Sequence, residues 1–342
     1  MTKRPTQEEV ARIAGTSTAV VSYVLNNGPR SVSEDARRRV LAAIAKTGYR
    51  PNSAARALVS GRSTVIGLVV PDLANPFLAQ LTQSLERELF GRGYSLLIGD
   101  SGDEPAREAT VVETLLAQQV AGLVWYSVDL PPPLDVLGGS ALPVVVVNDL
   151  AGSGVTEAAP AGRLISVDAE EYRGVRLATE HLLAHGRTRI AHLGGPQGRL
   201  NSAERSRGWA DAVSAAGLSP TVRMNVPFTQ EAGADAAGHL LESGCDAVVT
   251  ANEMQATGLL RGLHRAGVRV PEDLSVVAYN GTPAAAFAIP SLTTVELQVS
   301  ALAREIADAL EPDSAVTGLT AASELVRRES CGCEVPAAEA DA

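Results

Sequence analysis

The chain has 342 residues, of which 45% are hydrophobic and only 4% aromatic, and its formal net charge is −10. This length allows two or three domains with hydrophobic cores, and the aliphatic composition favours α/β layers over an all-β sandwich. Its longest apolar stretches, such as VAGLVWYSV from Val120, are too short to span a membrane, and no secretory signal is apparent at the start. With only three cysteines there is no disulfide framework, so we expect a cytoplasmic protein.

The charge is divided unevenly along the chain. Residues 1–62 contain eleven Lys or Arg and four acidic residues, a net charge of +7, so the other 280 residues carry −17. A basic segment on an acidic body indicates a polyanionic partner for that segment alone. The alternative is a basic surface that is merely solvated.

Three helices are predicted within the first fifty residues. Thr6 begins the capping-box sequence TQEE, so a first helix starts there and ends at Gly15. A second helix begins near Ser17, and a third runs from Ser33 to Gly48. Two helices joined by a tight turn that contains glycine form a helix-turn-helix, whose second helix enters the major groove of DNA.

The second helix has one small and uncharged face. Its other face is apolar and is predicted to pack in a core, whereas arginines flank the segment. Small side chains can lie against base edges while charged neighbours hold phosphates. The alternative is a bundle helix whose outer face is only solvated. The face consists of Thr18, Ala19, Ser22 and Tyr23.

A short helix is predicted after the third one. Pro51 ends the first unit, Asn52 can cap a helix through Leu58, and Gly61 ends it before a strand. Because a lone helix of this length is marginal in water, it should order only against DNA or against its twin in a dimer.

The remaining sequence alternates apolar strands with amphipathic helices from residue 63 to residue 330. This alternation predicts parallel sheets with helices on both faces, here as two doubly wound lobes. Ligands of such folds lie where loops leave the carboxyl ends of the strands, so we expect a cleft between the lobes.

Catalytic and cofactor motifs are weak. The segment LGGPQG follows a strand but lacks the GxGxxG spacing, and no GxxxxGK[ST] motif is present. His181 and His185 could form a metal pair, but no third ligand is near in sequence, so we interpret them as solvated. Cys331 and Cys333 could bind a soft metal or form a redox pair, and we interpret them as ordinary thiols. We therefore expect no enzyme, no cofactor and no metal.

Many segments resemble one family. The sequences VARIAGTSTAVVSYVLNN and GYRPNSAARAL, followed in order by DLANPFLAQL, LPVVVVND, RIAHLGGP, VPEDLSVVAYN and PSLTTVELQ, are similar to the LacI/GalR family of bacterial transcriptional regulators. The resemblance implies a helix-turn-helix domain (1–50), a hinge (51–62), a body of two lobes like periplasmic binding proteins (63–330) and an acidic, disordered tail (331–342). It places the first lobe at 63–162 and 292–327 and the second at 163–291.

The resemblance also implies a function. The chain is expected to repress transcription as a homodimer on an inverted-repeat operator, with a small molecule between the lobes that changes DNA affinity. Leu58 would insert into the central base step as a minor-groove wedge. The residues expected at DNA are Thr6, Ser17, Thr18, Ala19, Ser22, Tyr23, Asn26, Ser33, Tyr49, Asn52, Ala55 and Leu58, and those expected at the effector are Phe77, Asn148, Arg205, Asn252 and Asn280.

The effector class is left open. Arg205, in SxxR spacing with Ser202, would hold a ligand oxygen, although a structural ion pair is the alternative. Asn148 and Asn280 stand where sugar-binding members commonly carry aspartate, which favours an anionic ligand over a neutral one. A sugar, a sugar phosphate, a carboxylate and a nucleobase all remain candidates.

Two other classes of function compete with this prediction. A solute-binding protein could share the two-lobed body, but the basic first segment opposes it, and a dinucleotide-dependent enzyme would need the missing glycine motif. Salt-sensitive retention on DNA that requires residues 1–62 would separate a regulator from both.

Overall fold

The computed structural model describes residues 5–26, 31–50, 63–127, 132–147, 163–220 and 222–333. The chain divides into two compact units, Met1–Ser63 and Thr64–Ala342, which we call the N-terminal unit and the body. The hinge (51–62) and Asn148 lie outside the described residues.

The N-terminal unit contains the three predicted helices. The hydroxyl of Thr6 caps the first helix by accepting a hydrogen bond from the Glu9 amide at 3.2 Å, and Ser33 caps the third helix in the same way. Gly15 and Gly48 end these helices with φ of 60° and 65°, a left-handed backbone that favours glycine. Buried valines join the helices, which are α1 (Gln7–Ala14), α2 (Thr18–Asn26) and α3 (Glu34–Thr47).

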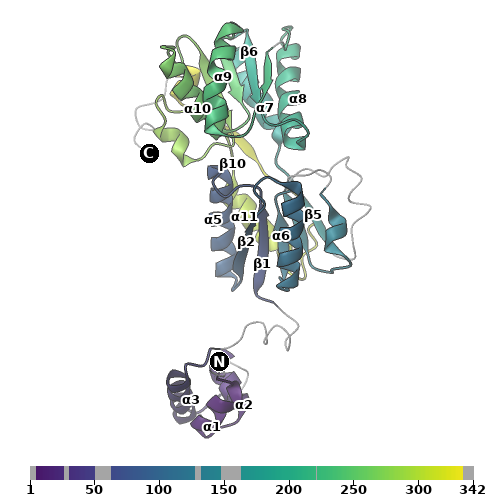
Figure 1. Cartoon of the computed structure of the whole chain (residues 1–342), viewed down its shortest axis with the longest axis vertical. Coiled ribbons are helices and arrows are strands. Elements are labelled where there is room, and N and C mark those ends of the chain that lie inside the picture. The colour runs from purple at the N-terminus through teal and green to yellow at the C-terminus, as the bar shows by residue number, and fades with distance from the viewer. Residues whose placement is uncertain are drawn as a thin grey trace. The chain divides into compact units, whose positions relative to one another are not determined.

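The body contains two six-stranded sheets, each flanked by helices, as Figure 1 shows. The first sheet has the strand order β11-β5-β4-β3-β1-β2, and every neighbouring pair is parallel. The central strands of this sheet are buried on both faces, and this burial explains the continuous apolar runs of the sequence. Its elements are β1 (Val65–Val70), α5 (Pro76–Gly91), β2 (Ser95–Asp100), α6 (Pro105–Ala117), β3 (Gly122–Trp125), η1 (Leu134–Leu137), β4 (Val144–Val147), β5 (Leu164–Asp168), α11 (Val299–Leu310) and β11 (Gly318–Thr320).

The second sheet has the order β12-β10-β9-β8-β6-β7. All of its neighbouring pairs are parallel except β10 with β12, which is antiparallel at one edge. Its elements are α7 (Glu171–Ala184), β6 (Ile190–Gly194), α8 (Leu200–Ala215), β7 (Arg223–Asn225), α9 (Gln230–Glu242), β8 (Ala247–Thr250), α10 (Glu253–Arg265), β9 (Ser275–Tyr279), η3 (Pro283–Phe287), β10 (Thr293–Leu297), β12 (Ser323–Val326) and η4 (Glu329–Cys331).

The predicted fold class is confirmed, but the lobe boundaries differ from those expected. Strand β5 belongs to the first sheet although residues 163–291 were assigned to the second lobe. Of the segment 292–327, only α11 and β11 return to the first lobe, because β10 and β12 pair within the second sheet. An apolar run indicates that a strand is buried, but it does not indicate which strand lies beside it. The sequence pattern therefore cannot tell which of the two sheets the strand joins.

Helix α10 lies between β8 and β9, in keeping with the predicted alternation of strands and helices. The expected extent of the C-terminal tail also differs from the structure. The segment 331–333, assigned to a disordered tail, is described, and Cys331 is 1% exposed within the core of the body. Residues 334–342 lie outside the described residues.

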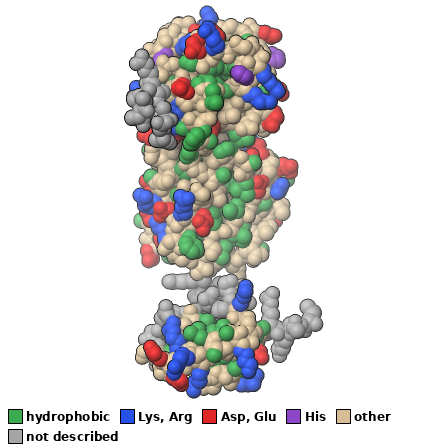
Figure 2. Space-filling view, turned by 90° about the vertical axis from the view of Figure 1, so that its left-hand side faces the viewer, with side chains coloured by type: hydrophobic (Ala, Val, Ile, Leu, Met, Phe, Trp, Pro, Cys, Tyr) green, Lys and Arg blue, Asp and Glu red, His purple; other side chains and the backbone are tan. Residues whose placement is uncertain are grey.

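Among the residues that the structure describes, few large apolar side chains are exposed. Figure 2 shows hydrophobic, basic and acidic side chains mixed over one face of the body, with basic side chains prominent on the N-terminal unit. Within the described ranges, no helix combines the length and hydropathy needed to cross a membrane.

Candidate functional site

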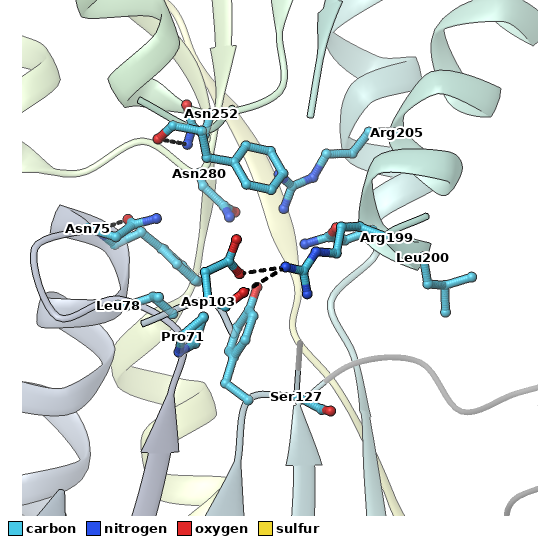
Figure 3. Close-up of a pocket in the computed structure, with 14 residues that line it drawn as sticks. Pro71, Asn75, Leu78, Asp103, Ser127, Arg199, Leu200, Arg205, Asn252 and Asn280 are labelled. Atoms are coloured by element: carbon cyan, nitrogen blue, oxygen red, sulfur yellow. Dashed lines mark hydrogen bonds and ion pairs between the residues drawn. The ribbon is translucent and has the colours of Figure 1, made fainter. Parts of the chain in front are cut away.

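A cleft lies between the two lobes of the body. It encloses about 560 Å³ of space that protein atoms do not fill, counting its open mouth. Its walls come from loops at the carboxyl ends of β1, β2 and β3 in the first sheet and of β6, β7, β8 and β9 in the second, as expected for doubly wound lobes. The lining residues drawn in Figure 3 are Pro71, Asn75, Phe77, Leu78, Asp103, Tyr126, Ser127, Arg199, Leu200, Asn201, Arg205, Phe228, Asn252 and Asn280.

Arg205 lies at the second-lobe wall of the cleft and is ion-paired. Its guanidinium donates to both carboxylate oxygens of Glu171, at 2.5 and 3.0 Å, and to the Ala251 carbonyl at 2.7 Å. Both partners are nearly buried, with side-chain exposures of 2% and 9%. Burial alone would lower the pKa of Arg205, but the Glu171 carboxylate outweighs it and the pKa lies above its ordinary value. The positive charge is thus already balanced inside the protein.

Two aromatic rings fix the Arg205 guanidinium further. Its central carbon lies 4.6 Å from the ring centre of Tyr279 and 5.6 Å from that of Phe228, distances typical of cation–π contacts. Of the five guanidinium N–H groups, three are used by Glu171 and Ala251. Arg205 can therefore offer a ligand two N–H donors, but as part of a neutral pair.

A second ion pair joins the lobes across the cleft. Arg199, which precedes α8, lies 2.9 Å from an Asp103 carboxylate oxygen and also donates to the Asp103 carbonyl at 3.2 Å (Figure 3). Burial raises the pKa of Asp103, and the Arg199 guanidinium opposes that rise. Nothing in the sequence indicated this pair, because the two residues are 96 positions apart and come from different sheets.

Aromatic side chains form the first-lobe wall. Phe77 is 5% exposed in the first turn of α5, where the Asn75 side chain caps the helix by accepting from the Phe77 amide at 3.0 Å. Tyr126 follows β3 and is buried; its burial, reinforced by the Glu171 carboxylate, raises its pKa to about 12. The phenol therefore stays protonated and can donate a hydrogen bond at neutral pH.

The two predicted asparagines differ in what their amides do. Asn252 caps α10, with its oxygen accepting from the Gln255 amide at 2.8 Å and its nitrogen donating to the Phe228 carbonyl at 3.3 Å. Asn280 is 7% exposed, with a left-handed φ of 58°, and its side-chain oxygen is buried without a partner among the described residues. Asn280 lines the cleft, and its unsatisfied side-chain oxygen costs stability unless water or a ligand donates to it.

Glu253, the residue that follows Asn252, does not line the cleft. Its carboxylate accepts from the amide and the hydroxyl of Thr282 at 2.6 and 3.2 Å. Four of the five predicted effector residues, Phe77, Arg205, Asn252 and Asn280, therefore lie along one cleft. Their contact with an effector stays a prediction.

The residues predicted to contact DNA fall into two groups. Thr18 and Ala19 are exposed on α2, while Ser22 and Tyr23 are half-buried. The hydroxyls of Thr6, Ser17 and Ser33 accept hydrogen bonds at the starts of helices, and Tyr49 packs against the core of the unit. The Asn26 side chain and all of Asn52, Ala55 and Leu58 lie outside the described residues.

The histidines and cysteines, interpreted from the sequence as solvated imidazoles and ordinary thiols, converge in the structure. The side chains of His181, His185, Cys331 and Cys333 converge, with one ligand atom from each lying within 4.8 Å of all the others. The third ligand absent near the histidines in sequence lies 150 positions away.

Comparison with known proteins supports the same architecture. Residues 6–52 match the family "Bacterial regulatory proteins, lacI family", and residues 179–331 match "Periplasmic binding protein-like domain". The chain is 33% identical to the ribose operon repressor of Bacillus subtilis over 89% of this chain and 90% of that protein. It is 34% identical to the transcriptional regulator CelR of Thermobifida fusca, with the same coverage of each chain.

Solved structures of similar proteins have the same architecture. The lac repressor dimer bound to operator and the anti-inducer ONPF has a TM-score of 0.84 and 27% identity, covering 96% of this chain and 99% of that one. The CelR–cellobiose complex has a TM-score of 0.69 and 30% identity, covering 96% and 100%. With its helix-turn-helix unit and its two-lobed body, the chain belongs to the LacI family of DNA-binding bacterial transcriptional regulators, which are not enzymes.

Proposed function

We propose that the protein is a cytoplasmic repressor that binds an inverted-repeat operator as a homodimer and responds to a neutral, hydroxyl-rich effector, of the sugar class, in the interlobe cleft. The operator and the effector act on different units of the chain. The two parts of the proposal therefore rest on different observations.

Operator binding is supported by the N-terminal unit. The basic charge of residues 1–62 attracts phosphates, and α2 exposes the small side chains of Thr18 and Ala19. In a helix-turn-helix, such a face lies against base edges in the major groove. The lac repressor is a relative whose dimer has been solved on operator DNA.

The class of effector follows from the charge balance of the cleft. Its charged lining residues are Asp103, Arg199 and Arg205. Arg199 pairs with Asp103, and Arg205 pairs with Glu171 behind the wall, so each of these charges already has a counter-ion within the protein. Asparagines in place of the family's aspartates favour an anionic effector only if the positive charge of Arg205 is free to bind it. The Glu171 carboxylate already balances that charge. A neutral ligand can bind without the unpaired charge that a phosphate or carboxylate would leave in the cleft.

The observation that carries the sugar class is the Asn280 oxygen. A buried acceptor without a partner suits a hydroxyl donor, and Phe77 and Phe228 offer apolar faces for the C–H side of a sugar ring. Relatives fit this class: several similar proteins are ribose operon repressors, and CelR has been solved with cellobiose.

A dimer is supported by one edge of the first sheet, where β2 has no further strand beside it among the described residues. Strand β2 ends the strand order, and the first lobe exposes large apolar side chains close to it in sequence. Phe90, at the end of α5, is 73% exposed, and Leu97 and Ile98 in β2 are 38% and 41% exposed. Exposed apolar side chains along an unpaired edge are typical of a surface that associates.

Genome-wide mapping of bound sites followed by thermal-shift screening tests both parts. We expect the full chain to select an inverted repeat, and neutral mono- or oligosaccharides suggested by the neighbouring genes to stabilise it and change its operator affinity. Stabilisation by sugar phosphates or carboxylates, without any response to neutral sugars, would contradict the proposed effector class.

A variant links the response to the cleft. Asn280→Gly removes the unpartnered acceptor and tolerates the left-handed φ of that residue. The variant should keep operator affinity in the absence of effector and lose the effector response. An unchanged effector affinity in Asn280→Gly would remove this residue from the site.

A further inference from the structure

The cluster of His181, His185, Cys331 and Cys333 lies in the second lobe, and none of its members lines the interlobe cleft. His181 occupies the last turn of α7, and His185 follows one turn later at the helix end. Cys331 ends η4, and Cys333 follows two residues later. Two short pairs, HLLAH and CGC, thus supply all four side chains.

The two cysteines are held firmly by the body. The Ser330 hydroxyl donates to the Val276 carbonyl at 2.7 Å and accepts from the Thr293 amide at 2.8 Å. The Cys331 carbonyl accepts from the Ser275 hydroxyl at 3.2 Å. Gly332 turns the chain with a φ of 92°, a left-handed backbone available to glycine, so that both thiols face α7. The sulfurs are therefore positioned before any ligand arrives.

Distances within the cluster fit a tetrahedral site. The Nε2 atom of His181 lies 3.3 Å from the Cys331 sulfur and 3.5 Å from the Cys333 sulfur, and His185 Nε2 lies 3.3 Å from the Cys333 sulfur. Zinc bonds of about 2.0–2.1 Å to nitrogen and about 2.3 Å to sulfur hold the ligand atoms of a tetrahedron about 3.3–3.8 Å apart. Because no pair exceeds 4.8 Å, the widest needs to contract by at most about 1.5 Å.

Hydrogen bonds among the two imidazoles and the two thiols alone would stabilise this cluster poorly. A neutral imidazole carries at most one proton on Nε2, so His181 would have to divide it between two sulfurs, and thiols are weak hydrogen-bond partners. A single cation at the centre uses the lone pair of each nitrogen and each thiolate at once. The Thr293 hydroxyl, 3.1 Å from the Cys331 sulfur, is placed to support that thiolate from the outer shell.

We propose that these four side chains form a Cys₂His₂ site for Zn²⁺. Two thiolates and two imidazoles are the ligand set that zinc prefers in closed, four-coordinate structural sites. On binding, each thiol releases its proton to solvent, and the sulfurs and nitrogens donate their lone pairs to the ion. His185 is exposed and Cys331 is buried, so the ion enters from the His185 side.

The ion would fasten the end of the described chain to α7. The ligands are 146–152 residues apart, so zinc closes a long loop and joins η4 to the helix that supplies Glu171 at its other end. Because the folded state binds zinc more tightly than the unfolded chain, the site should raise the melting temperature of the body. The site is thus structural and separate from effector binding.

Zinc content and cobalt spectroscopy of the full-length protein test the proposal. The protein, purified under reducing conditions without a histidine tag, should contain one zinc ion per chain by elemental analysis. Replacement by Co²⁺ should give a thiolate-to-cobalt charge-transfer band and intense visible bands, which report tetrahedral coordination with sulfur.

Variants separate this site from adventitious binding. Cys333→Ser and His185→Gln remove the less buried cysteine and the exposed histidine. Each variant should lose far more zinc affinity than the about 10–100-fold typical of an outer-shell change. His264→Gln, an exposed histidine on α10, and Cys245→Ser, a thiol elsewhere in the second lobe, are the matched controls and should each retain one zinc ion.

A reduced wild-type chain that shows neither zinc nor the cobalt charge-transfer band would overturn the proposal, as would equal zinc binding by Cys333→Ser. Circular dichroism of each variant, with operator binding as a second check, establishes that lost zinc does not reflect lost folding.

Discussion

Replacing Glu171 by Gln should destabilise the body strongly, because it leaves the Arg205 guanidinium buried without its counter-ion. The pair is bidentate, and its side chains are 2% and 9% exposed. Removing one partner of such a pair lowers the free energy of unfolding by about 3–5 kcal/mol. For a unit of this size, that corresponds to a fall in melting temperature of roughly 5–15 °C.

A matched control lies on the same helix. Glu180 pairs with Arg176 at 2.7 Å, but their side chains are 47% and 44% exposed. Water screens this pair, so Glu180→Gln should change the free energy of unfolding by less than about 1 kcal/mol. The two variants make the same Glu→Gln change and differ only in how deeply the ion pair is buried. Urea unfolding of each variant measures its free energy of unfolding.

The same substitution also tests the charge argument for the effector. In Glu171→Gln the unpaired guanidinium should bind anions, so phosphate or sulfate should restore part of the lost stability and leave the wild type unaffected. Equal and small losses in both variants, or anion stabilisation of the wild type as strong as that of Glu171→Gln, would refute the reasoning.

Three other predictions concern operator binding and assembly. Tyr23→Arg should gain a preference for guanine at one symmetric pair of operator positions, by roughly 1–3 kcal/mol per bidentate contact, in binding selections; if both proteins select the same motif, Tyr23 does not read bases. Leu58→Ser should reduce specific affinity and DNA bending while sparing nonspecific binding, and unaltered bending in a gel-phasing assay would rule out the wedge. Phe90→Asp should weaken the dimer in sedimentation, whereas Phe287→Asp, which changes an 80%-exposed side chain of the second lobe, should not; equal behaviour would place the dimer surface elsewhere.

The sequence by itself determined the local structure and the family. Thr6 and Ser33 as helix starts, and Gly15 and Gly48 as helix ends, could be predicted because capping involves groups only a few residues apart. The alternation of strands and helices likewise predicted doubly wound lobes, since burial on both faces leaves apolar runs in a parallel sheet. Phe77, Arg205 and Asn252 were placed at the cleft by resemblance.

Only the tertiary structure decided which distant residues meet. Glu171 and Arg205 are 34 positions apart, and their pairing changed the argument for an anionic effector into one for a neutral ligand. The pairs containing His181 and Cys331 are each too small for a metal site, and they become one because α7 ends beside η4. The sheet that β10 joins, like the two groups of side chains above, depends on contacts between residues far apart in the sequence. Short-range sequence patterns do not indicate which distant segment a residue will contact once the chain between them closes into a loop.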